Sequence, residues 1–335
     1  MASKSREVHL VSRPKGEPTL DLFQIASVEL PEPQAGQVLV RNLYISVDPY
    51  MRGRMSESKS YVPPFELGKP MEGGAIGRVV ESKDSSVSKG QLVLSRFGWR
   101  EGFVAPAPEL QPFDPQGAPV AAFLGTLGMT GLTAWAGLFK IASLQEGETV
   151  FVSAAAGAVG SVACQLAKRH GCRVIASAGT SEKVAFLRDE LKADYAFDYH
   201  DGDALEHLEK AAPEGIQVYF DNTGGPQLEA ALASLQMHGR VALCGAIAGY
   251  NTPVPGPRNL HAAIGKRLRL QGFIVIDFMK DLAAFHAEAV PALLAGKLLH
   301  RETIVKGLDQ APAAILSLLG SGDKHIGKLL VQVGD

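Results

Sequence analysis

The sequence predicts an α/β protein that combines a doubly wound parallel sheet with a second, β-rich domain. The first observation is a regular alternation of short apolar strands and helical segments from about residue 124 to 301, which is typical of a parallel sheet with helices on both faces. The second is the different texture of residues 1–123, where short strands are separated by turn clusters such as PEPQAG and SKDSSVSKG. A chain of 335 residues with 46% apolar content is long enough for two such cores.

The β-rich domain is expected to contain strands at four short runs: Glu7–Val11, Gln37–Val47, Gly74–Glu81 and Gln91–Phe97. Pro-rich sequence then continues to a boundary that we place near Phe123. At the other end of the chain, IGKLLVQVGD has a strand-like pattern and follows a predicted helix at about Gln310–Leu319. We expect this last strand to pair back into the β-rich domain, which would then comprise residues 1–123 and 302–335, with the α/β domain at 124–301.

Six strands are predicted in the α/β domain, with helical segments between most of them. They are Thr149–Ala154, Arg173–Ala178, Asp194–Asp198, Gln217–Asn222, Arg240–Gly245 and Leu268–Ile276. Before the first of them, GTLGMTGLTAWAGLFKIASL predicts a helix that leads into the domain. Because parallel strands need helical crossovers, this order favours a doubly wound sheet.

The α/β domain is organised around Val150–Gly171, which reads VFVSAAAGAVGSVACQLAKRHG. A β-branched run leads into a Gly-rich turn and then into an amphipathic helix. Against the dinucleotide-binding pattern G-x-G-x-x-G the turn has Ala155, Gly157 and Gly160, so that alanine replaces the first glycine. Such a turn brings backbone amides and the positive end of a helix to a pyrophosphate. A close-packed strand–helix turn without a ligand is the alternative.

The residues after the second strand of this domain bear on the choice between NAD and NADP. In NAD sites an acidic residue, about twenty positions past the glycines, binds the adenosine ribose hydroxyls. Here the run is SAGTSEK, from Ser177 to Lys183, with no carboxylate at the strand end. This favours NADPH, because Lys183 can make charge-assisted hydrogen bonds to a 2′-phosphate. The alternatives are Glu182 as an NAD ligand, Thr180 or Ser181 as a helix N-cap, and Lys183 as a solvated lysine.

Composition excludes several other classes of function. The net charge of −2, with both signs mixed along the chain, gives no electrostatic footprint for nucleic acid or an anionic membrane. No signal peptide or membrane span is predicted, so we expect a cytoplasmic protein. The three cysteines, Cys164, Cys172 and Cys244, are expected to be reduced core residues. The histidines and cysteines lack the spacing of a zinc site, so no metal is expected.

Seven segments resemble one family along almost the whole chain, in the expected order and at the expected spacing. They are VDPYMRGRM, MEGGAIGRVVES, GTLGMTGLTAW, SAAAGAVGS, GTSEK, VYFDNTGG and CGAIAGYN. Together they are similar to the zinc-independent branch of the medium-chain dehydrogenase/reductase superfamily, and within it to the group of leukotriene B4 dehydrogenase/prostaglandin reductase, double-bond reductases and curcumin reductase. The resemblance implies a GroES-like, partly open barrel as the catalytic domain, a Rossmann domain that binds NADPH, and usually a homodimer.

The resemblance also implies roles for particular residues. The residues that match cofactor contacts of the family are Ala156, Gly157, Ala158, Val159 and Gly160 in the turn, Thr180, Lys183 and Tyr199 for the 2′-phosphate, Asn222 near the nicotinamide, and His325. Those expected to bind the substrate are Tyr50, Tyr61, Met129 and Tyr250, of which Tyr250 is the catalytic candidate. The chain departs from the family pattern at Thr130, Trp135 and His325, which affects the pocket shape and one cofactor contact.

The implied reaction is NADPH-dependent reduction of the carbon–carbon double bond of α,β-unsaturated ketones and aldehydes, small molecules that would be the only partners besides a second copy of the chain. Hydride transfer to the β-carbon leaves an enolate, whose oxygen needs hydrogen-bond donors such as the Tyr250 phenol and a ribose hydroxyl. Two alternatives remain. One is an NADPH quinone oxidoreductase of the same superfamily, and the other is an NADPH-binding sensor without catalysis.

Overall fold

The structure, a computed structural model, describes residues 3–320 and 325–334. The chain divides into two compact units. In the described residues, the first unit contains the chain up to Leu124, residues 302–320 and residues 329–334. The second unit contains Gly125–Arg301 and His325–Lys328. Residues 325–328 thus lie with the second unit, whereas the sequence placed them in the β-rich domain.

The first unit is built mainly from antiparallel strands. A two-stranded sheet joins β1 (Ser3–Leu10) to β2 (Phe23–Leu30). A larger sheet has the order β14-β15-β3-β4-β5-β7, with β6 also paired to β3, and it does not close into a barrel along this path. The strands of this sheet are β3 (Gln37–Ser46), β4 (Ala75–Ser82), β5 (Leu92–Ser95), β6 (Gly102–Pro106), β7 (Gln111–Phe113), β14 (Glu302–Lys306) and β15 (Lys328–Gln332).

The core of the larger sheet comes from the alternation of its strands. The side chains of Val38, Val40 and Val79 are buried together with Val93 and Phe103 from the strands on either side. Because successive residues of a strand point to opposite faces, these i, i+2 positions form one apolar face. A single turn of helix, α1 (Met51–Arg54), follows β3.

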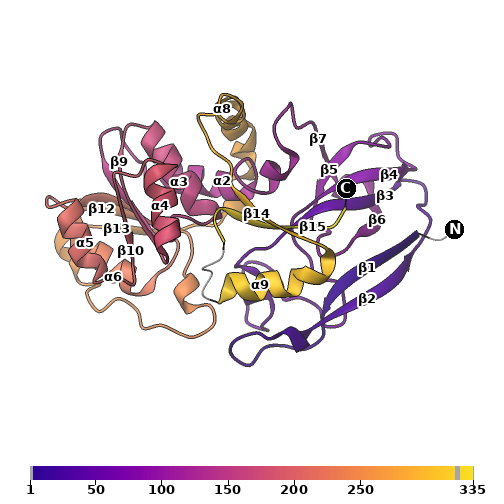
Figure 1. The fold of residues 1–335 in the computed structure, drawn as a ribbon, viewed down its shortest axis with the longest axis horizontal. Coiled ribbons are helices and arrows are strands. Elements are labelled where there is room, and N and C mark those ends of the chain that lie inside the picture. Colours follow the sequence, from indigo (N-terminus) through magenta and orange to yellow (C-terminus); the bar gives the residue numbers. More distant parts are fainter. Residues whose placement is uncertain (1–2, 321–324, 335) are drawn as a thin grey trace. The chain divides into compact units, whose positions relative to one another are not determined.

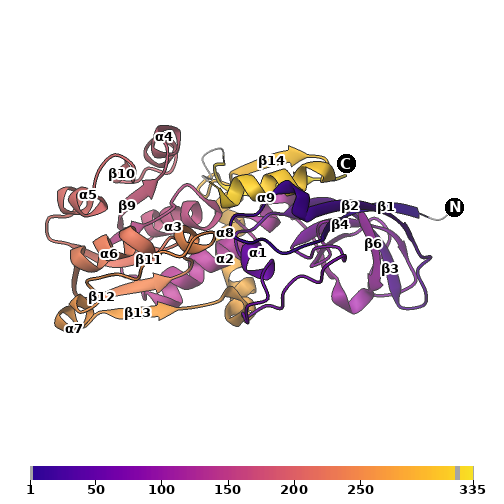
Figure 2. The same cartoon turned by 90° about the horizontal axis from the view of Figure 1, so that it is seen from below.

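The C-terminal end of the chain completes the first unit. Strand β15 pairs antiparallel with β3, with Leu330 opposite Ser46, which confirms the prediction that the last strand returns to the N-terminal part. Strand β14 lies next to β15, and in both views the yellow helix α9 (Ala311–Leu319) lies near the indigo strands β1 and β2 (Figures 1 and 2). Residues from both ends of the chain therefore build one unit.

The second unit is a six-stranded parallel sheet in the order β10-β9-β8-β11-β12-β13. The strands are β8 (Thr149–Val152), β9 (Arg173–Ala178), β10 (Tyr195–Asp198), β11 (Ile216–Asp221), β12 (Leu235–Leu243) and β13 (Arg269–Gly272). The path leaves β8 toward β10 and then returns to β11 on the other side of β8. Since crossovers between parallel strands are right-handed, this reversal puts helices on both faces of the sheet, and the predicted doubly wound fold is confirmed.

Seven α-helices of the second unit surround this sheet (Figure 1). They are α2 (Met129–Trp135), α3 (Ala158–Arg169), α4 (Ser181–Asp189), α5 (Ala204–Ala211), α6 (Gly225–Ser234), α7 (Ala262–Lys266) and α8 (Leu282–Leu294). Two of them begin at capping side chains: Thr180 accepts from Lys183 N, and Asp203 accepts from Leu205 N. Within residues 3–320 and 325–334 none of the helices combines the length and the apolar character needed to cross a bilayer.

Several strand predictions, among them those for β12 and β13, differ from the structure in their bounds. Strand β12 begins at Leu235 and not at Arg240, so the MHG segment belongs to the strand, and its pairing with β11 has a register shift between Ile216 and Val218. Strand β13 ends at Gly272, and the apolar run that we assigned to it continues instead as a 3₁₀ helix over Val275–Asp281. A short apolar run does not by itself distinguish an edge strand from a helical turn.

Candidate functional site

The candidate site lies at the carboxyl edge of the six-stranded sheet, inside the second unit. The strand order reverses between β8 and β11, and ligands of open α/β sheets bind outside the carboxyl ends at such a point. Ser153 directly follows β8, and Asp221 is the last residue of β11. The loops after β9 and β12 bring Lys183 and Tyr250 to the same edge. The sheet thus brings Lys183 and Tyr250 to the edge at which the Gly-rich turn after β8 lies.

The turn between β8 and α3 is tight and leaves helix amides available. Ala154 has a positive φ of 45°, a left-handed conformation, and its carbonyl accepts a hydrogen bond from Gly157 N at 3.0 Å. Gly157 is the N-cap of α3 and makes no side-chain capping hydrogen bond. The amides of the first turn of α3, from Ala158 to Gly160, therefore point toward the space that an anion would occupy, and the helix dipole favours negative charge there.

Gly160 allows α3 to approach this turn. A Cβ atom at Gly160 would lie 2.5 Å from the carbonyl oxygen of Ala154 and 2.7 Å from Cα of Ala155, and both are backbone atoms that cannot move aside. We expect Gly160→Ala to destabilise the protein by roughly 1–3 kcal/mol, as overpacking does. Thermal unfolding with and without NADPH would measure this loss and the smaller stabilisation by the cofactor.

The matched control for that substitution is Gly265→Ala. Gly265 lies in α7, and a Cβ atom there meets no atom within 4 Å. Its melting temperature should equal that of the wild type or exceed it slightly, since alanine is the better helix former. An unchanged melting temperature for Gly160→Ala would contradict the close packing of α3 on the turn.

The segment 325–328 lies against the same turn. Gly327 N donates to the carbonyl of Ala156 at 2.8 Å, and Gly327 forms a parallel bridge with Gly157. Gly327 has a φ of 73°, and a Cβ atom there would lie 1.9 Å from the carbonyl oxygen of Arg301, so only glycine fits. Gly327 thus contacts the turn directly, and half-buried His325 lies two residues before Gly327 in the chain. Sequence spacing alone did not indicate the approach.

The end of β9 has the features that the sequence indicated. The strand ends at Ala178, and Thr180 caps α4 by accepting a hydrogen bond from Lys183 N at 3.3 Å. Lys183 is half-buried in the first turn of α4. Tyr199, which follows β10, packs against Gly179, where a Cβ atom would lie 2.8 Å from Tyr199 Oη. The structure thus brings Thr180, Lys183 and Tyr199 to one strand end.

Asn222 and Tyr250 lie in the loops that follow β11 and β12. The side-chain amide of Asn222 donates to the carbonyl of Ser153 at 2.7 Å, and Asn222 N donates to Ser153 Oγ at 3.0 Å, so Asn222 ties its loop to the turn after β8. The Tyr250 phenol is oriented back to the end of β12, since a Cβ atom on Gly245 would lie 3.6 Å from Tyr250 Oη. Burial raises the pKa of Tyr250, so the phenol is neutral at pH 7 and can donate a hydrogen bond.

Met129 and two of the three departures from the family pattern, Thr130 and Trp135, lie in α2. Met129 begins this helix with a side chain that is 42% exposed. Thr130 Oγ1 donates to the carbonyl of Gly125 at 2.8 Å, so this threonine stabilises the turn before the helix. Trp135 is buried and packs near the ring of Phe285, with 6.5 Å between ring centroids. Thr130 and Trp135 therefore have structural partners of their own.

Tyr50 and Tyr61 belong to the first unit, where they lie near one another. Tyr50 is the N-cap residue of α1 and is half-buried. Burial raises its pKa first, and the charge of nearby Asp48 raises it further, while Arg54 acts in the opposite direction. Nearby Tyr61 also raises the pKa of Tyr50, and Tyr61 is itself 54% exposed. Both remain predicted substrate-binding residues.

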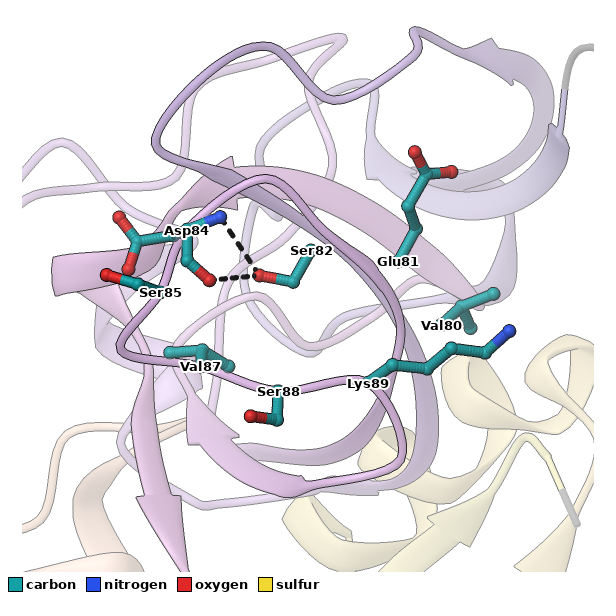
Figure 3. A pocket seen from close by; sticks show the side chains of 8 residues that line it. All are labelled: Val80, Glu81, Ser82, Asp84, Ser85, Val87, Ser88 and Lys89. Atoms are coloured by element: carbon teal, nitrogen blue, oxygen red, sulfur yellow. Dashed lines mark hydrogen bonds between the residues drawn. The ribbon is translucent and has the colours of Figure 1, made fainter.

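A cavity of about 600 Å³ in the first unit involves other residues. Its lining comes from the turn that joins β4 to β5, as Figure 3 shows: Val80, Glu81, Ser82, Asp84, Ser85, Val87, Ser88 and Lys89. Ser82 Oγ and Asp84 close this turn on themselves with hydrogen bonds of 2.9 and 3.1 Å. The hollow is thus part of a hairpin turn and contains none of the site residues that the sequence predicted.

The residues at the sheet edge fit a phosphorylated dinucleotide. Glycine at 157 and 160 keeps the space beside the turn free of side chains, and the α3 terminus lacks a capping side chain that would compete for its amides. At the end of β9 a threonine and a half-buried lysine stand where an acid would repel a phosphate. In the described part of the chain no cluster of three or more His, Cys, Asp or Glu residues could hold a metal ion.

Sequence reasoning missed one polar cluster at this edge. Tyr219 and Asp221 lie on the same face of β11, and both contact Ser153 after β8: Tyr219 Oη and Ser153 Oγ are 2.9 Å apart, and Ser153 Oγ lies 3.5 Å from Asp221 Oδ1. All three side chains are buried. The i, i+2 spacing of Tyr and Asp in VYFD was a signal for it, because polar residues two apart share one face of a strand.

Comparison with known proteins matches both units to families of oxidoreductases. A family model described as the N-terminal domain of oxidoreductase matches residues 6–113, and one described as zinc-binding dehydrogenase matches residues 158–290. The chain is 40% identical to 2-alkenal reductase (NADP(+)-dependent) of Nicotiana tabacum, over 92% of this chain and 90% of that one. It is 38% identical to the NADPH-dependent curcumin reductase of Escherichia coli (strain K12), over 98% and 97%.

A solved structure is similar over the same extent. It is CurA in complex with NADPH from Vibrio vulnificus, with a TM-score of 0.92 and 38% identity. The match covers 98% of this chain and 99% of that one. The similarity therefore includes both units and the full cofactor-binding sheet.

Proposed function

This chain belongs to the medium-chain dehydrogenase/reductase family, and from that premise we propose that it is an NADPH-dependent reductase of carbon–carbon double bonds in α,β-unsaturated ketones and aldehydes. The observation that carries the proposal is the pairing, at one sheet edge, of a phosphate-binding helix terminus with the neutral phenol of Tyr250. The relatives named above act on a 2-alkenal and on curcumin, and each is described as NADP- or NADPH-dependent.

The geometry of the second unit supports the following roles for the cofactor residues. The amides of residues 156–160 bind the pyrophosphate at the start of α3. Lys183 and Thr180 bind the 2′-phosphate, with Tyr199 beside them against Gly179. Asn222 holds its loop at the nicotinamide side through Ser153, and His325 approaches the turn with the segment that Gly327 anchors.

The chain's catalytic contribution is a hydrogen-bond donor for developing charge. NADPH supplies, when bound, a hydride for the β-carbon of the substrate. Negative charge then develops on the carbonyl oxygen of the substrate, and the Tyr250 phenol stabilises it by donating a hydrogen bond. The α-carbon is protonated afterwards by a tyrosine or by water. We expect Met129, Tyr50 and Tyr61 to contact the rest of the substrate.

A panel of electron acceptors tests this function. Oxidation of NADPH, followed by its absorbance, would be measured with a linear enal, an aryl enone and a benzoquinone, each repeated with NADH. We expect turnover of the enal and the enone with NADPH and a saturated carbonyl product. Absence of enal and enone turnover, or a preference for NADH, would refute the proposal.

Two other functions give different results in the same panel. A quinone oxidoreductase would yield hydroquinone or semiquinone and leave the enal unchanged. A sensor would bind NADPH tightly and would not oxidise it with any of the acceptors. We also expect a cytoplasmic homodimer, for which light scattering on the purified protein is the direct measurement of mass.

A further inference from the structure

The buried cluster of Tyr219, Asp221 and Ser153 lies between the turn after β8 and the loop after β11. Tyr219 stacks on Phe151 of the paired strand β8, with ring centroids 4.9 Å apart. This packing fixes the position of the Tyr219 hydroxyl group. Asp221 is 1% exposed, and none of the described cations forms an ion pair with it at 4.0 Å or less. Hydrogen bonds, and not an ion pair, therefore hold this carboxyl group in place.

One oxygen of Asp221 receives most of those hydrogen bonds. Oδ1 accepts from Tyr219 Oη at 2.8 Å and from the backbone amides of Thr223 and Gly224 at 2.9 and 2.8 Å. Oδ2 is buried and has no hydrogen-bond partner among the described residues. Burial raises the pKa of Asp221, against the effect of these donors. A buried carboxyl group with one unpartnered oxygen is a poor contributor to stability, so its fixed position calls for another explanation.

The loop that Asp221 holds connects in turn to the segment that carries Tyr250. The backbone carbonyl of Asp221 accepts from Cys244 N at 2.9 Å and from Gly245 N at 3.0 Å. The carbonyls of Asn222 and Thr223 accept from Ile247 N and Ala248 N at 3.3 and 3.2 Å. Four backbone hydrogen bonds thus join residues 221–223 to residues 244–248, which come shortly before Tyr250. A shift of the first segment would therefore displace the second.

We propose that Asp221 is a positioning residue for the reaction, which fixes the loop 222–224 and through it the segment 244–250, so that the Tyr250 phenol is held where the substrate oxygen gains charge. This inference rests on the proposed function of Tyr250. Asp221 itself does not touch the reacting atoms. Its side chain acts as an acceptor for two loop amides, a role that depends on oxygen geometry and not on charge.

Two substitutions at Asp221 distinguish the loss of its charge from the loss of its acceptor oxygen. Asp221→Asn keeps an acceptor oxygen at Oδ1 and the same shape, so it should retain kcat within about 3-fold of the wild type. Asp221→Ala removes the acceptor and should lower kcat roughly 10- to 100-fold through misplacement of Tyr250. The KM for NADPH should change little, because the phosphate contacts lie on α3 and α4. Rescue by asparagine and a kcat effect without a KM effect are both expected.

Hydrogen exchange gives a readout that does not depend on activity. In Asp221→Ala the amides of Thr223, Gly224, Ile247 and Ala248 should exchange faster, while Ser161 N, bonded to the carbonyl of Gly157 in α3, should not change. Asp221→Asn should keep the protection of all of them. Since exchange is measured without substrate, a failure of the proposed reaction leaves this part of the inference testable.

The matched control is Asp194→Ala. Asp194 is also a structural acceptor, bonded to Val174 N at 2.7 Å and to Lys168 Nζ at 2.9 Å, but it precedes β10 at the opposite edge of the sheet. It should lower the melting temperature and leave kcat unchanged. If Asp221→Ala does not fold, Tyr219→Phe removes one donor to Oδ1 and keeps the ring, and should show the same pattern with a smaller amplitude.

Three results would overturn the inference. One is wild-type kcat in folded Asp221→Ala. Another is a large loss of kcat in Asp221→Asn with unchanged exchange, which would assign the effect to charge. The third is unchanged exchange at Ile247 and Ala248 in Asp221→Ala, because the connection from Asp221 to Tyr250 would then be absent.

Discussion

Tyr250→Phe should lower kcat for enone reduction roughly 100-fold and leave the KM for NADPH nearly unchanged, as expected when one donor to a developing oxyanion is removed. The substitution deletes only the hydroxyl oxygen, and the ring keeps its half-buried place after β12. Steady-state kinetics with the enal and enone of the panel would measure both constants. NADPH binding, followed by its fluorescence, would show that the cofactor site is intact.

The pH dependence of the wild type gives an independent check on Tyr250. Because burial raises the pKa of this phenol, its donor form persists as the pH rises through its ordinary value of about 10. We therefore expect kcat to fall only above about pH 10, and this alkaline limb to disappear in Tyr250→Phe. Retention of the limb in the variant would assign it to another group.

A second tyrosine of the same unit serves as the control. Tyr195 in β10 bonds His207 Nδ1 through its hydroxyl at 3.0 Å and lies away from the loops after β11 and β12. Tyr195→Phe should have wild-type kcat. Wild-type kcat in Tyr250→Phe as well would remove Tyr250 from the catalytic role.

Lys183→Ala should reduce kcat/KM for NADPH by roughly 10- to 100-fold, the range expected for losing charge-assisted hydrogen bonds to a phosphate. The value for NADH, which has no 2′-phosphate, should stay within about 3-fold of the wild type. The physical basis is the position of Lys183 in the first turn of α4, at a strand end without a carboxylate. Initial rates at several concentrations of each cofactor would give both values.

The control for Lys183 is an exposed lysine elsewhere in the second unit. Lys210 lies in the last turn of α5 and is exposed to solvent. Lys210→Ala should leave the ratio of the two cofactors unchanged. Equal losses with NADPH and NADH in Lys183→Ala would mean that Lys183 supports the fold or the turn and does not recognise the phosphate.

The sequence was sufficient for the parts of the fold that depend on local patterns. β9 has the predicted bounds, and the doubly wound order follows from the alternation of strands and helices. Strands β2, β6, β7 and β14 were not predicted. For β6 the reason is that its partner, β3, lies far away in the chain, so no local pattern indicates the pairing. The end of β13 was also wrong, since its apolar run suits a helical turn equally well.

The candidate site shows the same division between local and distant information. Thr180 and Lys183 were accessible from the sequence, because a strand end and a helix cap are adjacent in the chain. The approach of Gly327 to the turn at Ala156 was not, because no local pattern encodes a contact between segments so far apart. The link from Asp221 to residues 247 and 248 likewise depends on which strands are neighbours in the sheet.

The packing of Tyr199 on Gly179 has a consequence for how cofactor preference can change. An aspartate at the strand end is what an NAD site uses, but its Cβ atom at position 179 would meet the ring of Tyr199 at 2.8–3.0 Å. This substitution alone would therefore force the Tyr199 side chain to move. We therefore expect an aspartate at position 179 to favour NADH only when Tyr199 is replaced by a smaller residue as well, so at this position the change of cofactor depends on two residues that lie twenty positions apart in the chain.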